Sequence, residues 1–131
     1  MGWRTDFLDH VIERLKEITD IGDVRRDWDE AQMEYPSLIV NMSEESYERT
    51  LGESEGVTTM GFRIFGKIQT GDSDRYEDLD DLVDDVIQAL EGITAYDVIV
   101  ETTTFHERIG GNRLTFETEG HAVIEKDFSS M

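Results

Sequence analysis

The chain has 131 residues, of which 31 are Asp or Glu and 12 are Lys or Arg, so its formal charge is −19. It contains no cysteine, which excludes disulfides and thiolate chemistry. The length predicts a single domain over residues 1–131, and no segment has the composition of an export signal or a membrane span. Because a strongly negative surface repels phosphate, we expect no direct binding of nucleic acid.

Three explanations fit the acidic composition. The carboxylates can serve solubility alone, or they can be an adaptation to high salt, where ions screen the repulsion between them. The second explanation agrees with the shortage of lysine, since the three lysines stand beside nine arginines. In the third, the acidic surface mimics DNA and occupies a basic partner protein. The composition does not choose among these three.

The first part of the chain predicts one helix and two strands. Apolar residues recur at three- and four-residue spacing from Thr5 to Thr19, which is typical of an amphipathic helix with Thr5 as its N-cap. Alternation predicts a short strand from Val24 to Trp28. The Tyr35-Pro36 pair imposes an extended backbone before a second strand, Ser37 to Met42. The polar stretch at about 43–56 is rich in Glu and Ser and predicts a long acidic loop.

The middle of the chain has the clearest strand, Val57 to Gln69. Its alternation predicts two different faces. One face carries Met60, Phe62, Ile64 and Ile68, and the other carries Thr59, Arg63, Phe65 and Lys67. A second helix is predicted over Arg75 to Glu91, because Asp74 and Glu77 have the spacing of a capping box and Gly92 stands at a C′ position.

Two more strands complete the pattern, Tyr96 to Phe105 and Arg113 to Lys126, with a hairpin turn around residues 110–112. Gly120 predicts a β-bulge in the last strand. The predicted fold class is α+β, with a mostly antiparallel sheet of about five strands and two helices packed on one face, in the order α-β-β-β-α-β-β.

Candidate sites for chemistry have better structural explanations. A calcium loop of the EF-hand type beginning at Asp72 needs Gly at its sixth position and Glu at its twelfth, where this chain has Glu77 and Val83. The three histidines, His10, His106 and His121, lack the spacing of metal ligands, although the last hairpin can bring His106 and His121 together. No serine lies in a nucleophile elbow. We therefore expect no catalytic, metal or cofactor site, and no enzyme.

A family resemblance follows from the layout of the elements along nearly the whole chain. The segments that carry it are Leu15 to Ile18, Val24 to Trp28, Tyr35 to Val40, Phe62 to Phe65, Leu79 to Leu90 and Ala122 to Ile124. In this order they resemble the tail terminator, or tail-completion, proteins of long-tailed bacterial and archaeal viruses, which include proteins similar to minor tail protein U. The long acidic loop and the shortage of lysine depart from typical members.

The resemblance implies a structural protein of the virion. It implies a homo-oligomeric ring, usually of six copies, that caps the tail tube and joins it to the head after assembly in the host cytoplasm. The implied partners are the tail tube protein and the neck or head-completion proteins, while DNA passes through the ring without specific binding. No catalytic residue is implied. The alternative function is an acidic inhibitor, a DNA mimic that binds a basic partner.

The predicted subunit interface lies on the second face of the long strand. It comprises Arg63, Phe65 and Lys67, together with Arg25 and Trp28 of the first strand. An aromatic residue and cations on one face are typical anchors of an interface. The other explanation is that Phe65 is an isolated surface aromatic and that the cations pair with carboxylates of neighbouring strands.

Overall fold

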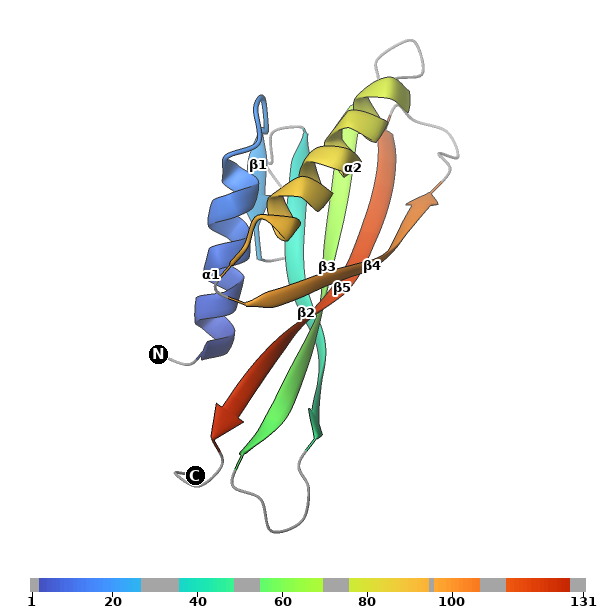
Figure 1. Cartoon of the computed structure of the whole chain (residues 1–131). Coiled ribbons are helices and arrows are strands. Elements are labelled where there is room, and N and C mark those ends of the chain that lie inside the picture. Colours follow the sequence, from blue (N-terminus) through green and yellow to red (C-terminus); the bar gives the residue numbers. More distant parts are fainter. Residues whose placement is uncertain are drawn as a thin grey trace.

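The computed structural model describes residues 3–26, 36–48, 55–69, 76–94, 96–106 and 113–127. They form two helices and a five-stranded sheet in one α+β domain (Figure 1). In chain order the elements are α1 (Trp3–Lys16), β1 (Asp23–Arg25), β2 (Ser37–Glu48), β3 (Glu55–Gln69), α2 (Tyr76–Glu91), β4 (Asp97–His106) and β5 (Arg113–Asp127). The predicted fold class and order of elements are confirmed.

The strands lie side by side in the order β1-β2-β3-β5-β4. Strand β1 is parallel to β2, and every other pair of neighbours is antiparallel. The long strand β3 therefore lies at the centre of the sheet, and β1 and β4 form its two edges.

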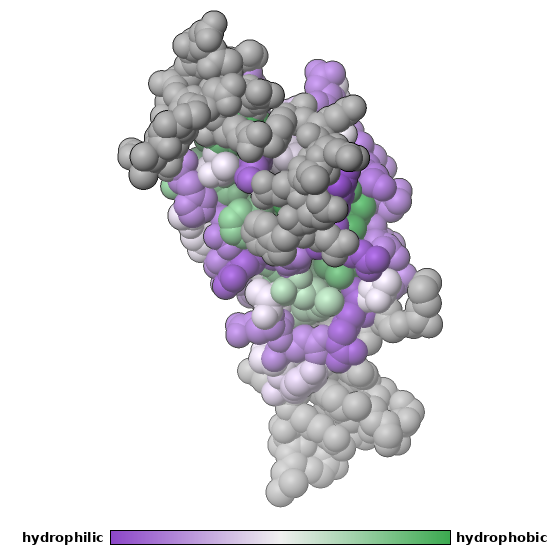
Figure 2. Space-filling model, turned by 180° about the vertical axis from the view of Figure 1, so that it is seen from behind, coloured by the Kyte–Doolittle hydropathy of each residue, from purple (hydrophilic) through white to green (hydrophobic). Residues whose placement is uncertain are grey.

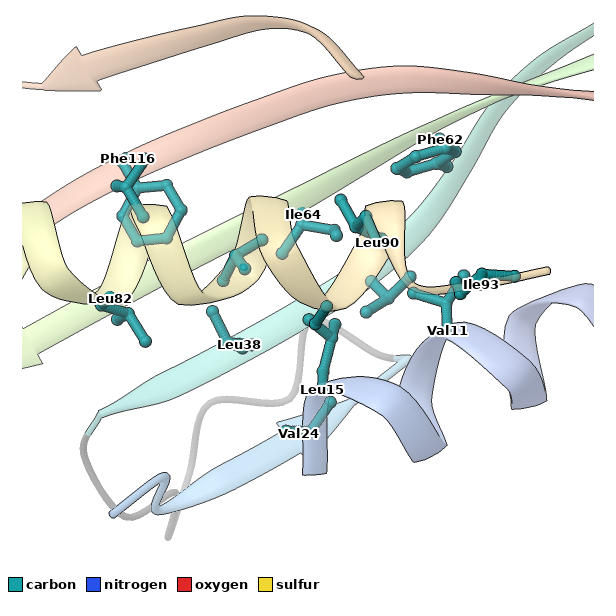
Figure 3. Packing of buried hydrophobic residues seen from close by; sticks show 14 of the residues in the cluster. Val11, Leu15, Val24, Leu38, Phe62, Ile64, Leu82, Leu90, Ile93 and Phe116 are labelled. Carbon is teal, nitrogen blue, oxygen red and sulfur yellow. The ribbon is translucent and has the colours of Figure 1, made fainter. Parts of the chain in front are cut away.

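Both helices cover the same face of the sheet, and the core lies between them and the strands (Figures 1 and 3). The helical spacing explains this, because it places the apolar residues of each helix in one stripe. The predicted inward face of β3 is confirmed. The core includes Phe7, Val11 and Leu15 from α1, Leu82, Val86 and Leu90 from α2, and Met60, Phe62 and Ile64 from β3.

Tyr96, which precedes β4, connects that strand to α1. Its ring packs edge-on against Phe7, with ring centroids 5.2 Å apart. Its hydroxyl donates a hydrogen bond to Oδ2 of Asp6 at 2.8 Å. Burial, followed by this hydrogen bond, raises the pKa of Tyr96 to about 12. The start of α1 is thus attached to the β4 side of the sheet.

The helix boundaries differ slightly from the prediction. Helix α1 ends at Lys16 instead of Thr19, and the next amides donate to carbonyls three residues earlier, as Ile18 does to Leu15. Asp20 then has a φ of 64°, a left-handed conformation that a helix cannot continue through. Helix α2 ends as predicted at Glu91, where the amide of Gly92 donates to the carbonyl of Gln88 at 3.0 Å. The predicted cap at Asp74 and the turn at residues 110–112 lie outside the described residues.

The prediction of a long loop at about 43–56 is wrong at both of its ends. Strand β2 continues to Glu48 and β3 begins at Glu55. Of the predicted loop, only residues 49–54 lie outside the described structure. The two strands stay paired as far as Glu48 and Val57, and they extend beyond the helices (Figure 1). The sequence did not indicate this because the end of β2 is polar on both faces.

One contact attaches this extension to the start of α1. Both the Nε and the Nη2 of Arg4 donate to the carboxylate of Glu45, the second at 2.9 Å, and the hydroxyl of Tyr47 donates to the same carboxylate. The hydrogen bond to Glu45 raises the pKa of Arg4. The extended part of β2 is therefore held against the start of α1 through Glu45.

The predicted bulge at Gly120 is also corrected. The register shift lies in β4, between Val100 and Thr102, on the strand that pairs with Gly120. A Cβ at Gly120 would lie 2.5 Å from the carbonyl oxygen of Ile99 and 2.9 Å from the ring of Phe62. Glycine is needed here because the bulged strand and a core aromatic both approach its backbone.

Candidate interface on the open face of the sheet

The face of the sheet opposite the helices carries the predicted interface residues of β3. Arg63, Phe65 and Lys67 alternate with buried residues such as Ile64, so they point away from the core. Figure 2 shows this side of the molecule, and its described surface is mostly hydrophilic with small hydrophobic areas. We call it the open face.

Arg63 lies between two carboxylates of the neighbouring strand β5. Its Nε is 3.2 Å from Oε1 of Glu119 and 3.5 Å from Oε1 of Glu117. The Arg63 side chain is 52% exposed and that of Glu119 is 46% exposed, whereas Glu117 is largely covered. Arg63 therefore pairs with carboxylates of the neighbouring strand, as the alternative to an interface role expected. The pair of Arg63 and Glu119 is still in contact with water.

Phe65 is half-buried and stacks on a histidine from the edge strand. Its ring and that of His106 are nearly parallel, with an interplanar angle of 6° and centroids 6.5 Å apart. The Nε2 of His106 lies 4.0 Å from Oε2 of Glu117. Phe65 is therefore part of a row of contacts that runs from β3 across β5 to β4.

Arg25 lies on the same face, at the other edge of the sheet. The register pairs Arg25 with Ile39 of β2, and Ile39 in turn with Phe65, so the three residues stand in one row. The Nη2 of Arg25 is 2.7 Å from Oδ2 of Asp23. Trp28, the remaining predicted interface residue, lies outside the described residues.

A hollow of about 430 Å³ adjoins Arg63 on the open face. It forms where β2 and β4 each have a register shift and the strands between them carry Gly61 and Gly120. Its walls include Glu44, Glu101, Glu119, Arg63 and His121. The Nδ1 of His121 is hydrogen-bonded to Oε1 of Glu101, so the imidazole and this carboxylate already satisfy each other.

The histidines do not form a cluster. His106 pairs with Thr115 in the sheet and His121 pairs with Ile99, so the two are far apart along the last hairpin and do not meet. His10 lies on α1, where its ring packs against Tyr96. Within the described ranges, no three His, Asp or Glu side chains are grouped so that they could hold a metal ion.

The outer surface of α2 is the most uniformly acidic part of the described chain. The helix contains no Lys, Arg or His. Its exposed acidic residues are Asp78, Asp80, Asp81, Asp84, Asp85 and Glu91. The open face, by contrast, carries both positive and negative side chains. The structure therefore distinguishes two surfaces of different charge, which the composition alone does not.

Sequence reasoning found the β3 residues of the open face but missed their partners on β4 and β5. The alternation of β5 places Glu117 and Glu119 on one face, which the sequence does indicate. Their position beside Arg63 depends on the register between β3 and β5, which the sequence does not give.

No known family model matches the chain, and no curated protein is similar enough to be counted as a relative. Neither α1 nor α2, the helices that the structure describes, is both long and apolar enough to cross a membrane.

Proposed function

We propose that this chain is a ring-forming structural protein of a long-tailed virus, of the tail-terminator kind. Identical copies close into a ring, which caps the tail tube and joins it to the head. The partners in this function are further copies of the chain, the tail tube protein, and the neck or head-completion proteins. The resemblance of the sequence to this family is the starting point of the proposal.

The observation that carries the proposal is the one-sided build of the domain. Two helices cover one face of the sheet, while the open face carries the exposed Arg63 and the half-buried Phe65 in a chain whose charge is −19. The order of the elements is the one predicted from the sequence, and the resemblance is based on that order. A layer that is apolar on one side and mixed in charge on the other is suited to pack against a further copy.

The distribution of charge supports the passage of DNA. A ring of identical subunits repeats one head-to-tail contact, so each copy presents the same surface to the lumen. The outer surface of α2 is acidic along its described length, and such a surface lining the lumen repels phosphate instead of binding it. DNA can then pass without being retained.

The test of the proposed function is one variant with a matched control. Phe65→Ala removes the half-buried ring of the open face, and Tyr47→Ala removes an aromatic side chain that is 57% exposed on the opposite face. We expect Phe65→Ala to prevent ring formation and Tyr47→Ala to leave it intact, as measured by sedimentation velocity and electron microscopy. Phe65→Ala rings as abundant as those of the wild type would show that the open face is not the ring contact.

A genetic test addresses the virion itself. We expect genes for tail and capsid proteins on either side of this gene. In purified particles, we expect the protein at the joint between tail and head. Particles that are complete and infectious without the protein would contradict the proposal.

A second function is favoured by the surface of α2. A row of carboxylates such as Asp80, Asp81 and Asp84 resembles the phosphate charge of DNA, as an inhibitor of a basic protein requires. Under this function the chain is a stable monomer that captures a basic host protein, and duplex DNA competes for that protein. A ring without such a partner excludes it.

A further inference from the structure

Strand β4 is an edge of the sheet and has one free side. It pairs with β5, and within the part of the chain that the structure describes no strand pairs with its other side. The backbone N–H and C=O groups on that side are a template on which another strand can pair.

Only the first half of β4 carries features that usually protect an edge, namely the carboxylates of Asp97 and Glu101 and a register shift. The strand has neither Lys nor Pro, and residues 102–105 have no charge, so the register shift at Val100 and Thr102 is its main irregularity. Ile99 is 48% exposed and Phe105 is 53% exposed. Ile99 lies on the open face and Phe105 on the helix side, so a strand added to this edge would cover one of these apolar side chains, depending on its register.

We propose that the ring contact includes, besides the open face, the free edge of β4, which pairs with the β1 edge of a second copy and so joins the sheets of neighbouring subunits edge to edge. This inference rests on the proposed ring. Because β1 and β4 are the opposite edges of the sheet, the joint is head-to-tail. A head-to-tail joint repeats from copy to copy and closes into a ring when the rotation allows it.

The charges favour β1 over a second β4 as the partner. Asp97 and Glu101 are exposed on β4, and the acidic helix α2 packs against the same strand. Two β4 edges related by a twofold axis would bring these carboxylates together, which costs binding energy. The β1 edge instead carries Arg25 and, directly after it, Arg26, against the single carboxylate of Asp23, which lies 2.7 Å from Arg25. Opposite charges therefore meet in the head-to-tail joint.

Hydrogen–deuterium exchange on the intact protein tests this joint. The amides of β1 that do not bond to β2, and the amides of the part of β4 that faces β1 and does not bond to β5, should exchange at least tenfold more slowly in the assembled protein than in the monomer. Rings that form without this protection would overturn the inference and leave the proposed function standing. A protein that never assembles, alone or with tail tubes, would overturn both.

A charge reversal gives an independent test. Arg26→Glu and Asp97→Arg should each weaken assembly at least tenfold, and the double variant should restore it, because the two residues then exchange signs across the joint. Lys16→Glu makes the same charge change on an exposed part of α1 and is the matched control. Single variants that assemble like the wild type, or a double variant weaker than both, would overturn the β4–β1 pairing.

Discussion

The Nε of Arg63 lies 3.2 Å from Oε1 of Glu119, so a cation of β3 is tied to a carboxylate of β5 on the open face. Both side chains are about half exposed. An ion pair in contact with water typically contributes only about 0–1 kcal/mol to folding. Arg63 can therefore turn from Glu119 to a carboxylate of a neighbouring copy at little cost to its own subunit.

Reversing the charge of this residue should separate assembly from folding. Arg63→Glu places a third carboxylate beside Glu117 and Glu119, so we expect the free energy of unfolding to fall by about 1 kcal/mol. We expect ring formation to be lost, because the open face then repels the next copy. Arg63→Gln removes the charge without reversing it, so its ring formation should be intermediate between that of the wild type and that of Arg63→Glu. Denaturant unfolding and sedimentation velocity measure the two effects, and normal rings from Arg63→Glu would contradict this role.

Tyr96 predicts a loss of stability at high pH. Its pKa is raised to about 12 in the folded protein, above the usual value for tyrosine of about 10. Its hydrogen bond to Asp6 thus contributes fully below a pH of about 10, and the contribution is lost as the pH rises through about 12. We expect the melting temperature to fall over this window.

The control is Tyr96→Phe, which keeps the ring but removes the hydroxyl. In this variant the melting temperature should be lower near neutral pH and should fall less between the two pH values. In the wild type, ultraviolet absorbance should show one of the four tyrosines ionising near pH 12. Equal pH profiles for the two proteins would show that Tyr96 does not cause the fall.

Gly66 is a test of core packing under α2. A Cβ at this position would lie 2.2 Å from Cε1 of Phe116, a ring that is fully buried. Gly66→Ala should lower the free energy of unfolding by about 1–3 kcal/mol, as overpacking does. At Gly61 the closest atom is the hydroxyl of the exposed Ser43, which can rotate away. Gly61→Ala is therefore the control, and the two variants should differ clearly in denaturant unfolding; equal costs would contradict the packing.

The charge of −19 predicts that salt stabilises the fold. From about 0.1 M to about 1 M salt, the screening length falls from about 10 Å to about 3 Å, which weakens repulsion between the carboxylates. The melting temperature and the fraction of assembled protein should both rise over this range. A flat or falling series would argue against repulsion as the limit on folding and assembly.

The periodicity of the sequence was sufficient to predict the helices and the inward face of β3. Phe7, Val11 and Leu15 recur at helical spacing, and Met60, Phe62 and Ile64 alternate, so each set could only face one side. The polar end of β2 was missed because its strand conformation depends on pairing with β3, and not on burial. Nothing local in the sequence distinguishes such a segment from a loop.

The details of the candidate interface depend on contacts between distant parts of the chain. Gly120 predicted a bulge in β5, whereas the bulge lies in the neighbouring strand β4, because the glycine makes room for the backbone of that strand. The stacking of Phe65 on His106 joins residues from β3 and β4, which are separated by β5. Sequence patterns give the face on which a residue lies, but not its neighbours across the sheet.

Electron microscopy of the purified chain, mixed with tail tubes that lack it, tests the central claim most directly. The account predicts closed rings with a central opening, seated at the end of each tube and formed from identical subunits. Monomers or twofold dimers under every salt and protein concentration, with bare tube ends, would contradict it.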